Sequence, residues 1–368
     1  MRRLLLGLVI VLGACTAAPA LASSPLPEPS GCPAVPSVTL GTHVGAAAVC
    51  ADIGSTSLAY VGGDAAVTCA TIQAAGQDLF ADDPQECDGL ADDPLTVHVF
   101  VPAGVKTRGL PSIYMLSGSG STWTDWANQG IDLQKIADAY RTVVVAIGGQ
   151  TSWYVNWADG SLNAEDELLA IVREVDARYR VSRDRAKRAI AGLSMGGYGS
   201  MLMAERHPKL WADVVSFSGV TDIENPYVQA DVLALSYGVA HYSAPQAISR
   251  IWGEPVVGVK WRAENPARQV CGLKRSWVWF SSGDGVASAA DIGPGTATEA
   301  QTETVVHAAN VDLARALAQH GLTYTFLSRH GIHLGHYWQD DAAAVLPTLM
   351  HRIRTAAASP QAAHTPCG

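Results

Sequence analysis

The sequence of 368 residues lacks several features that mark particular classes of protein. Its formal net charge is −9 and it contains no basic run, which argues against nucleic acid as a partner. No stretch reaches the ~20 consecutive apolar residues that a membrane-spanning helix needs. Cys-x-x-Cys pairs are absent, so neither a zinc ribbon nor a thioredoxin-like redox site is indicated. With 48% hydrophobic and only 16% charged residues, the chain can instead bury a large core.

Residues 1–22 are typical of an export signal peptide rather than of a folded segment. Arg2 and Arg3 form a basic start, residues 4–12 are apolar, and Ala-Leu-Ala at 20–22 is typical of a cleavage site. The alternative is lipoprotein processing before Cys15, which would leave a lipid-bearing cysteine as a membrane tether. Both alternatives predict export, either as a secreted extracellular protein or as a lipid-anchored protein of the cell envelope.

The chain has seven cysteines, and six remain once Cys15 is set aside. An even number in an exported protein suggests up to three disulfides. Four of the six lie in residues 23–90, a stretch rich in Ala, Gly, Pro and Asp that we predict to be a disulfide-rich N-terminal extension. The sequence discloses neither the pairing nor the oligomeric state. The six are Cys32, Cys50, Cys69, Cys87, Cys271 and Cys367.

From residue 95 onward, apolar strand-like runs alternate with segments of helical periodicity. This alternation predicts an α/β domain over residues 91–355, with a mostly parallel central sheet and helices on both faces, followed by a C-terminal tail at 356–368. Residues 95–101 alternate apolar and polar side chains, which is typical of an outer strand. Other strands are predicted at 110–116, 142–147, 188–193, 212–218, 276–281 and 322–327, and helices at 165–179, 195–206, 305–320 and 342–353.

Residues 192–196 read Gly-Leu-Ser-Met-Gly and lie between an apolar strand and the start of a helix. A nucleophilic serine on a sharp strand-to-helix turn requires this context and small neighbours, so we predict the α/β-hydrolase fold with Ser194 as nucleophile. The helix N-terminus presents free N–H groups where an oxyanion would form, and we expect the Met195 N–H to be one donor. The alternative is a glycine-rich turn with an incidental serine.

A serine nucleophile needs a base, which in this fold follows the last strand. His330, His333 and His336 all lie in that segment. Three histidines at this spacing also suggest a metal site, but no cysteine or carboxylate accompanies them at ligand spacing, and glycines interrupt any helix there. A second oxyanion donor is expected in the glycine-containing turn at 117–120, and we choose the Ser119 N–H.

With these residues in place, the chain resembles the esterase D superfamily over about residues 95–350. This superfamily includes S-formylglutathione hydrolases and secreted mycolyltransferases of the antigen 85 type. Residues 114–118 resemble the turn that supplies the family's oxyanion donor, and residues 148–157 are close to a mycolyltransferase signature. Residues 331–333, followed by Tyr337-Trp338, match the family's catalytic-histidine motif. The resemblance therefore implies that His333 is the base.

The resemblance leaves three candidates for the acid that orients the histidine. In mycolyltransferase-like enzymes the acid is a Glu at the start of the helix before the final strand, which here is Glu303. In formylglutathione hydrolases an Asp directly follows the preceding strand, which favours Asp284, and Asp291 is a third candidate. The acid must be shielded and bonded to the inner nitrogen of His333, and burial is not readable from the sequence.

Mycolyltransferases carry an Asp and an Arg in the oxyanion turn and a Trp two residues after the catalytic His, but here these positions hold Ser117, Gly120 and Gly335. We therefore predict an exported serine esterase that acts through an acyl-enzyme on a small-molecule or lipid ester, with no metal or organic cofactor. The alternatives are an acyltransferase to a sugar or lipid hydroxyl, and a non-catalytic wall-binding protein. Aromatic side chains near the site are candidates for an acyl pocket or for core packing: Trp123, Trp126, Trp153, Tyr154 and Trp157.

Overall fold

The computed structural model describes residues 60–61, 95–105, 108–179, 181–230, 244–254 and 258–357. All of them belong to one compact unit of residues 39–368. The predicted signal peptide and nearly all of the predicted N-terminal extension and C-terminal tail lie outside the described residues. Within the described ranges Cys271 is the single cysteine, and it is disulfide-bonded. None of the described helices is long and apolar enough to cross a membrane.

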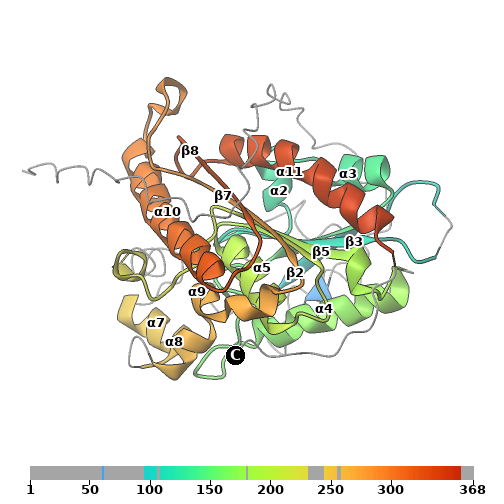
Figure 1. Cartoon of the computed structure of the whole chain (residues 1–368), viewed down its shortest axis with the longest axis horizontal. Coiled ribbons are helices and arrows are strands. Elements are labelled where there is room, and N and C mark those ends of the chain that lie inside the picture. The colour runs from blue at the N-terminus through green and yellow to red at the C-terminus, as the bar shows by residue number, and fades with distance from the viewer. Residues whose placement is uncertain are drawn as a thin grey trace, which may run out of the picture. The chain divides into compact units, whose positions relative to one another are not determined.

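The described strands form one sheet in the order β1-β2-β4-β3-β5-β6-β7-β8 (Figure 1). β2 pairs antiparallel with β1 and β4, and all other neighbours are parallel, so the predicted mostly parallel sheet is confirmed. The strands are β1 Tyr60–Val61, β2 Thr96–Phe100, β3 Ser112–Leu116, β4 Val143–Gly148, β5 Arg188–Leu193, β6 Asp213–Phe217, β7 Trp277–Gly283 and β8 Thr325–Arg329.

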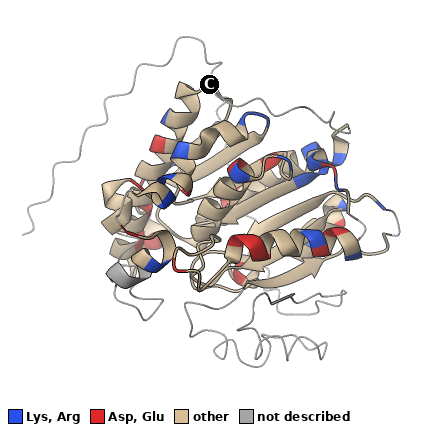
Figure 2. Cartoon of the chain, turned by 90° about the horizontal axis from the view of Figure 1, so that it is seen from below, with Lys and Arg blue, Asp and Glu red and all other residues tan. Residues whose placement is uncertain are grey.

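Helices cover both faces of this sheet because its strands bury side chains on both sides. Along β3, Ile113 and Met115 join one apolar cluster while Tyr114 and Leu116 join another. Helices α3 and α11 pack on the first face and α4, α5 and α10 on the second (Figure 1). Charged residues lie mainly on the helices, whereas the strands carry few (Figure 2). The described helices are α2 Asp125–Asn128, α3 Leu133–Tyr140, α4 Ala164–Arg178, α5 Met195–Arg206, α7 Ala244–Trp252, α8 Val259–Ala263, α9 Pro266–Gln269, α10 Thr296–Gln319 and α11 Gly335–Thr355, with short 3-10 turns at Arg185–Lys187, Val270–Leu273 and Ala289–Asp291.

Strand β2 corrects one expectation from the sequence. The prediction that it is an outer strand is wrong, because it lies between β1 and β4 and all five of its side chains are buried. Its polar positions are covered from within the fold. The His98 ring stacks on Trp123 with 4.3 Å between ring centroids, so the alternating pattern does not mark a solvent-exposed face.

Three elements begin three or more residues away from the start predicted from the sequence. Helix α10 begins at Thr296 rather than at 305, because its first turns hold Thr, Ala and Glu and therefore lack apolar periodicity. Helix α11 begins at Gly335 rather than at 342, so glycine does not exclude a helix there. Strand β8 spans Thr325–Arg329 rather than 322–327, because Leu322 and Tyr324 pack on the core without strand pairing.

The strand order places a topological switch point at the carboxyl ends of β3 and β5. β3 lies between β4 and β5, so the chain leaves β3 toward one side of the sheet and returns at β5 on the other. Ligands of open α/β sheets bind at such a switch point. A Cβ atom added at Gly196, in the first turn of α5, would lie 2.3 Å from the Leu116 carbonyl oxygen, so the ends of β3 and β5 are in direct contact.

Candidate active site

Ser194 occupies a strained turn between β5 and α5. Its backbone has φ 53° and ψ −120°, a region that non-glycine residues rarely adopt and that is common at functional sites. The turn closes tightly, since a Cβ atom at Gly192 would lie only 2.0 Å from the Gly196 carbonyl oxygen. The Ser194 N–H donates to the Phe217 carbonyl at 2.8 Å, which ties the turn to the end of β6. The side chain is therefore held at the carboxyl edge of the sheet.

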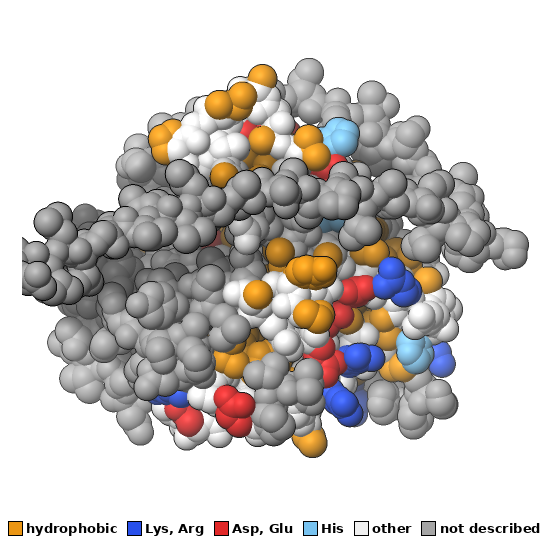
Figure 3. Space-filling view, turned by 90° about the vertical axis from the view of Figure 1, so that its left-hand side faces the viewer, with side chains coloured by type: hydrophobic (Ala, Val, Ile, Leu, Met, Phe, Trp, Pro, Cys, Tyr) orange, Lys and Arg blue, Asp and Glu red, His pale blue; other side chains and the backbone are white. Residues whose placement is uncertain are grey.

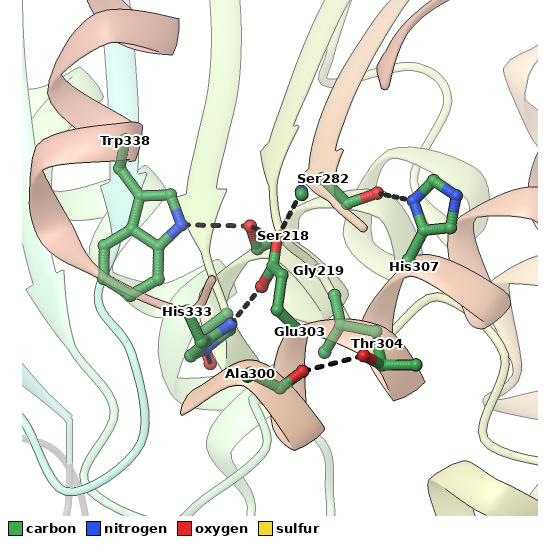
Figure 4. A network of polar contacts seen from close by, with 12 residues as sticks. Ser218, Gly219, Ser282, Ala300, Glu303, Thr304, His307, His333 and Trp338 are labelled. Atoms are coloured by element: carbon green, nitrogen blue, oxygen red, sulfur yellow. Dashed lines mark hydrogen bonds and ion pairs between the residues drawn. The ribbon is translucent and has the colours of Figure 1, made fainter. Parts of the chain in front are cut away.

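Three of the residues predicted from the sequence meet at this edge. The His333 Nε2 atom lies 2.9 Å from Ser194 Oγ. His333 Nδ1 lies 2.5 Å from Glu303 Oε2 (Figure 4). Glu303 comes from the second turn of α10 and is completely buried, whereas His333 lies on the loop after β8 and is 10% exposed. A serine, an imidazole and a shielded carboxylate in this order can carry out nucleophilic acyl transfer.

Glu303 remains charged although it is buried. Burial by itself would raise its pKa, but hydrogen bonds from His333, Ser218 and the Gly283 N–H, together with the His333 charge, hold the pKa of Glu303 below its ordinary value. The Oε1 atom accepts from Ser218 Oγ at 2.7 Å and from the Gly283 backbone at 2.5 Å. The carboxylate is thus fixed at both oxygens.

The other two candidate acids each pair with a different histidine. Asp284 Oδ2 lies 2.6 Å from His330 Nδ1, and the His330 side chain is 83% exposed. Asp291 lies 3.1 Å from His336 Nε2 and accepts a 2.7 Å hydrogen bond from the Tyr337 hydroxyl. Each of the three histidines thus lies beside a different carboxylate. Among the described residues, no group of three or more His, Cys, Asp or Glu side chains is arranged to hold a metal ion.

The predicted oxyanion turn, residues 117–120, lies next to Ser194. A Cβ atom at Gly118 would be 3.7 Å from Ser194 Cβ. The Gly118 N–H is taken by Asp125 Oδ2 at 2.7 Å and the Gly120 N–H by the Gln150 carbonyl at 2.7 Å. No described acceptor takes the Ser119 N–H between them. Met195 is the first residue of α5, so its N–H belongs to the free donors of a helix N-terminus.

The aromatic side chains near the site are packed in the core. All five are at most 4% exposed and belong to the two apolar clusters. Trp153, for example, packs edge-on against Tyr198 and Trp252. The Tyr154 hydroxyl donates to the Ser117 carbonyl at 2.9 Å and so supports the oxyanion turn from behind. The five are Trp123, Trp126, Trp153, Tyr154 and Trp157.

Sequence reasoning missed the residues that hold the site in place. Ser218 and Gly283 follow or end strands and bind Glu303, while Asp125 is buried and binds the oxyanion turn. Burial raises the pKa of Asp125. Ser218 is the last residue of the strand predicted at 212–218 and begins a Ser-Gly pair, which is a signal for a polar group at the carboxyl edge of the sheet.

A polar pocket of about 550 Å³ lies away from these residues, between the segment after β6 and the second half of α10. Arg268 pairs with Glu224 at 2.7 Å and Arg315 with Asp312 at 2.5 Å, so the pocket holds two ion pairs and one further carboxylate, that of Asp222. Figure 3, viewed from the side of α10, shows acidic and basic side chains next to each other on this face. The pocket is lined by Asp222, Glu224, Asn225, Pro226, Ala267, Arg268, Asp312, Arg315, Ala316, Gln319 and His320.

Curated relatives of this chain include mycobacterial proteins. It is 27% identical to the MPT51/MPB51 antigen of Mycobacterium tuberculosis over 52% of this chain and 64% of that protein. It is 25% identical to Esterase Rv1288 of the same organism over 71% of this chain, and it spans 56% of that relative's length. It is also 24% identical to the diacylglycerol acyltransferase/mycolyltransferase Ag85B of Mycobacterium leprae over 67% of this chain and 77% of that protein.

Solved structures share the fold. The crystal structure of Mycobacterium tuberculosis MPT51 superposes with a TM-score of 0.55 at 21% identity, covering 71% of this chain and 94% of that one. The S-formylglutathione hydrolase FrmB from Staphylococcus aureus superposes with a TM-score of 0.53 at 19% identity, covering 72% and 95%. The α/β-hydrolase architecture is thereby established. A family model described as "Putative esterase" matches residues 90–349, which is more than half of the chain, and the protein therefore belongs to the esterase family.

Proposed function

We propose that this protein is an exported serine carboxylic-ester hydrolase with Ser194, His333 and Glu303 as its catalytic triad. One observation carries the proposal: an unbroken series of short contacts runs from Ser194 Oγ through both ring nitrogens of His333 to a fully buried carboxylate. Membership of the esterase family supports it.

Each residue has a defined role in the proposed reaction. Ser194 Oγ attacks the ester carbonyl while His333 Nε2 takes its proton, and Glu303 stabilises the imidazolium that forms. The N–H groups of Met195 and Ser119 donate to the oxyanion. His333 then returns the proton to the leaving alcohol, and a water molecule activated by the same imidazole resolves the acyl-enzyme. These steps require only groups of this chain and water.

Transfer of the acyl group to a sugar or lipid hydroxyl is the second candidate, favoured by the similarity to Ag85B. Three positions argue for water as the acceptor instead. Ser117 is buried and its hydroxyl donates to the Thr122 carbonyl at 2.9 Å, while Gly120 has no side chain. At Gly335 there is no side chain, and the Gln129 side chain lies where one would begin, with its Oε1 atom 1.9 Å from an added Cβ atom.

Export is supported by two observations. Residues 1–22 have the pattern of a signal peptide, and Cys271 is disulfide-bonded, which is typical of an oxidising compartment. The N-terminal sequence of the mature protein tests this. A start at residue 23 supports secretion, a fatty-acylated Cys15 supports the lipid-anchored alternative, and an intact Met1 on the cell-associated protein contradicts both.

Covalent labelling and product analysis test the reaction. We expect a fluorophosphonate to label wild type but not Ser194→Ala, and Ser161→Ala, an exposed serine on another loop, serves as the labelled control. A panel of esters of increasing acyl length, with and without trehalose, should yield free acid. Abundant acyl-trehalose with little free acid would favour the acyltransferase, and absence of labelling would favour a non-catalytic binding protein.

A further inference from the structure

Ser218, the residue after β6, lies between Glu303 and Trp338. Its hydroxyl lies 2.7 Å from Glu303 Oε1 and 3.0 Å from the indole Nε1 of Trp338, and it is completely buried (Figure 4). The Trp338 side chain reaches it from the first turn of α11, on the opposite side from α10. Each of these two partners is more than 80 residues from Ser218 in the chain, so only the fold brings them to its hydroxyl.

The chemistry of the three groups fixes the direction of these hydrogen bonds. An indole N–H can only donate, so Ser218 Oγ must accept from Trp338. The serine's single proton is then directed to the carboxylate, which can only accept when it is ionised. With the Gly283 N–H at 2.5 Å, Glu303 Oε1 receives two donors, and Oε2 is left for His333 Nδ1.

Trp338 also contacts the other member of the pair. Its ring packs edge to face against the His333 imidazole, with 5.0 Å between centroids and 84° between planes. One indole thus holds the imidazole with its ring and the carboxylate with its N–H through Ser218. Ser218 itself has φ 47°, a costly conformation for a non-glycine residue, and such strain is retained at sites where a side chain has a role.

We infer that Ser218 and Trp338 are positioning residues that fix the Glu303 carboxylate, with one oxygen committed to the protein and the other presented to His333. This inference rests on the proposed function. Neither residue is assigned contact with the substrate, and both act through Glu303 and His333. The other titratable groups that interact electrostatically with Glu303 are His307, Arg329 and Asp341, and Arg329 and Asp341 form a separate bidentate pair.

Loss of the Ser218 hydroxyl should shift the pH profile of kcat/KM, an effect that is not expected if the residue has a purely structural role. Glu303 Oε1 would keep only the Gly283 donor, so more negative charge would face His333 through Oε2. His333 would then hold its proton more tightly, and the acid limb of the pH profile of kcat/KM would move to higher pH. Loss of a hydrogen bond to a charged group should also lower kcat/KM roughly ten- to a hundredfold.

The experiment compares two variants that both lack the hydroxyl but differ in backbone strain. Ser218→Gly relieves the positive φ and Ser218→Ala does not, so any shared effect on the pH profile comes from the hydroxyl. Trp338→Phe keeps the ring beside His333 while removing the N–H, and we expect a smaller shift in the same direction. The matched control is Ser282→Ala, on the neighbouring strand β7. It removes a hydroxyl that is bonded to His307, and we expect an unchanged pH profile of kcat/KM.

Thermal unfolding and fluorophosphonate labelling are measured on every variant, with the full-length exported protein. A shifted acid limb in both Ser218 variants, despite different stabilities, supports the inference. An unshifted profile in Ser218→Gly that remains folded and labelled overturns it. If wild-type Ser194 itself is neither labelled nor active, the proposed function fails instead, so the two failures are distinguishable.

Discussion

Two histidine–carboxylate pairs lie three residues apart along the loop after β8, and they have nearly the same contact distance. His333 Nδ1 lies 2.5 Å from Glu303, and His330 Nδ1 lies 2.6 Å from Asp284. Their surroundings differ. The side chains of the first pair are 10% and 0% exposed, whereas those of the second are 83% and 29% exposed.

The difference shows that contact geometry alone does not define a catalytic pair. Water screens the exposed pair and competes for its hydrogen bonds, so it stabilises the protein by little. Around Glu303 water is excluded, and the donors that replace it are fixed backbone and side-chain groups. Only His333 has its second ring nitrogen within hydrogen-bonding distance of Ser194. The two pairs therefore differ in burial and in whether the histidine also contacts Ser194.

The largest effect is expected when the side chain of each histidine is removed in turn. We expect His333→Ala to lower kcat for ester hydrolysis by roughly 10⁴-fold or more, because the general base is lost. His330→Ala should change kcat by less than about threefold, since its pair is exposed. Steady-state hydrolysis of a chromogenic ester measures both. An equal loss of kcat in the two variants would contradict the proposed difference between the two pairs.

The second test neutralises each carboxylate without changing its shape. Glu303→Gln should lower kcat by roughly 10³- to 10⁴-fold, because the amide favours the wrong tautomer of His333 and cannot stabilise its charged form. Asp284→Asn should leave kcat nearly unchanged. If Asp284→Asn were the inactive variant, the triad acid would be Asp284 and the assignment of Glu303 would be withdrawn.

A second buried glutamate extends the comparison to stability. Glu205, in the last turn of α5, is 5% exposed, and neither carboxyl oxygen has a hydrogen-bond partner. Burial raises the pKa of Glu205 well above its ordinary value, the opposite of the shift at Glu303. Both glutamates are buried, so the presence or absence of hydrogen-bond donors to the carboxylate decides whether its pKa is lowered or raised.

The smallest expected effect follows from that raised pKa. Between the ordinary pKa and the folded-state pKa the unfolded chain binds fewer protons than the folded one, so wild-type stability falls as pH rises through this window. Glu205→Gln removes this dependence and should raise the free energy of unfolding by about 1–3 kcal/mol at pH 8, with the gain vanishing toward pH 4. Urea unfolding measures the change. Glu174→Gln, a partly exposed residue of α4, is the control, and an equal gain in both would contradict the explanation.

The sequence determined features that depend on neighbouring residues. The position of Ser194 between a strand and a helix follows from local periodicity and small side chains, and the mostly parallel sheet follows from the alternation of strands and helices. Helix starts were less predictable, since the first turns of α10 and α11 carry no apolar periodicity.

Only the tertiary structure decided which carboxylate meets which histidine. Asp284, Asp291 and Glu303 lie within 20 residues of one another in the chain, and the sequence left all three open. Packing of α10 on β7 carries Glu303 inside the protein beside the Gly283 N–H and Ser218. Asp284 instead pairs with the exposed His330, and the buried Asp291 pairs with His336. Burial and donors contributed by distant segments have no local signature, because they exist only once those segments are packed together.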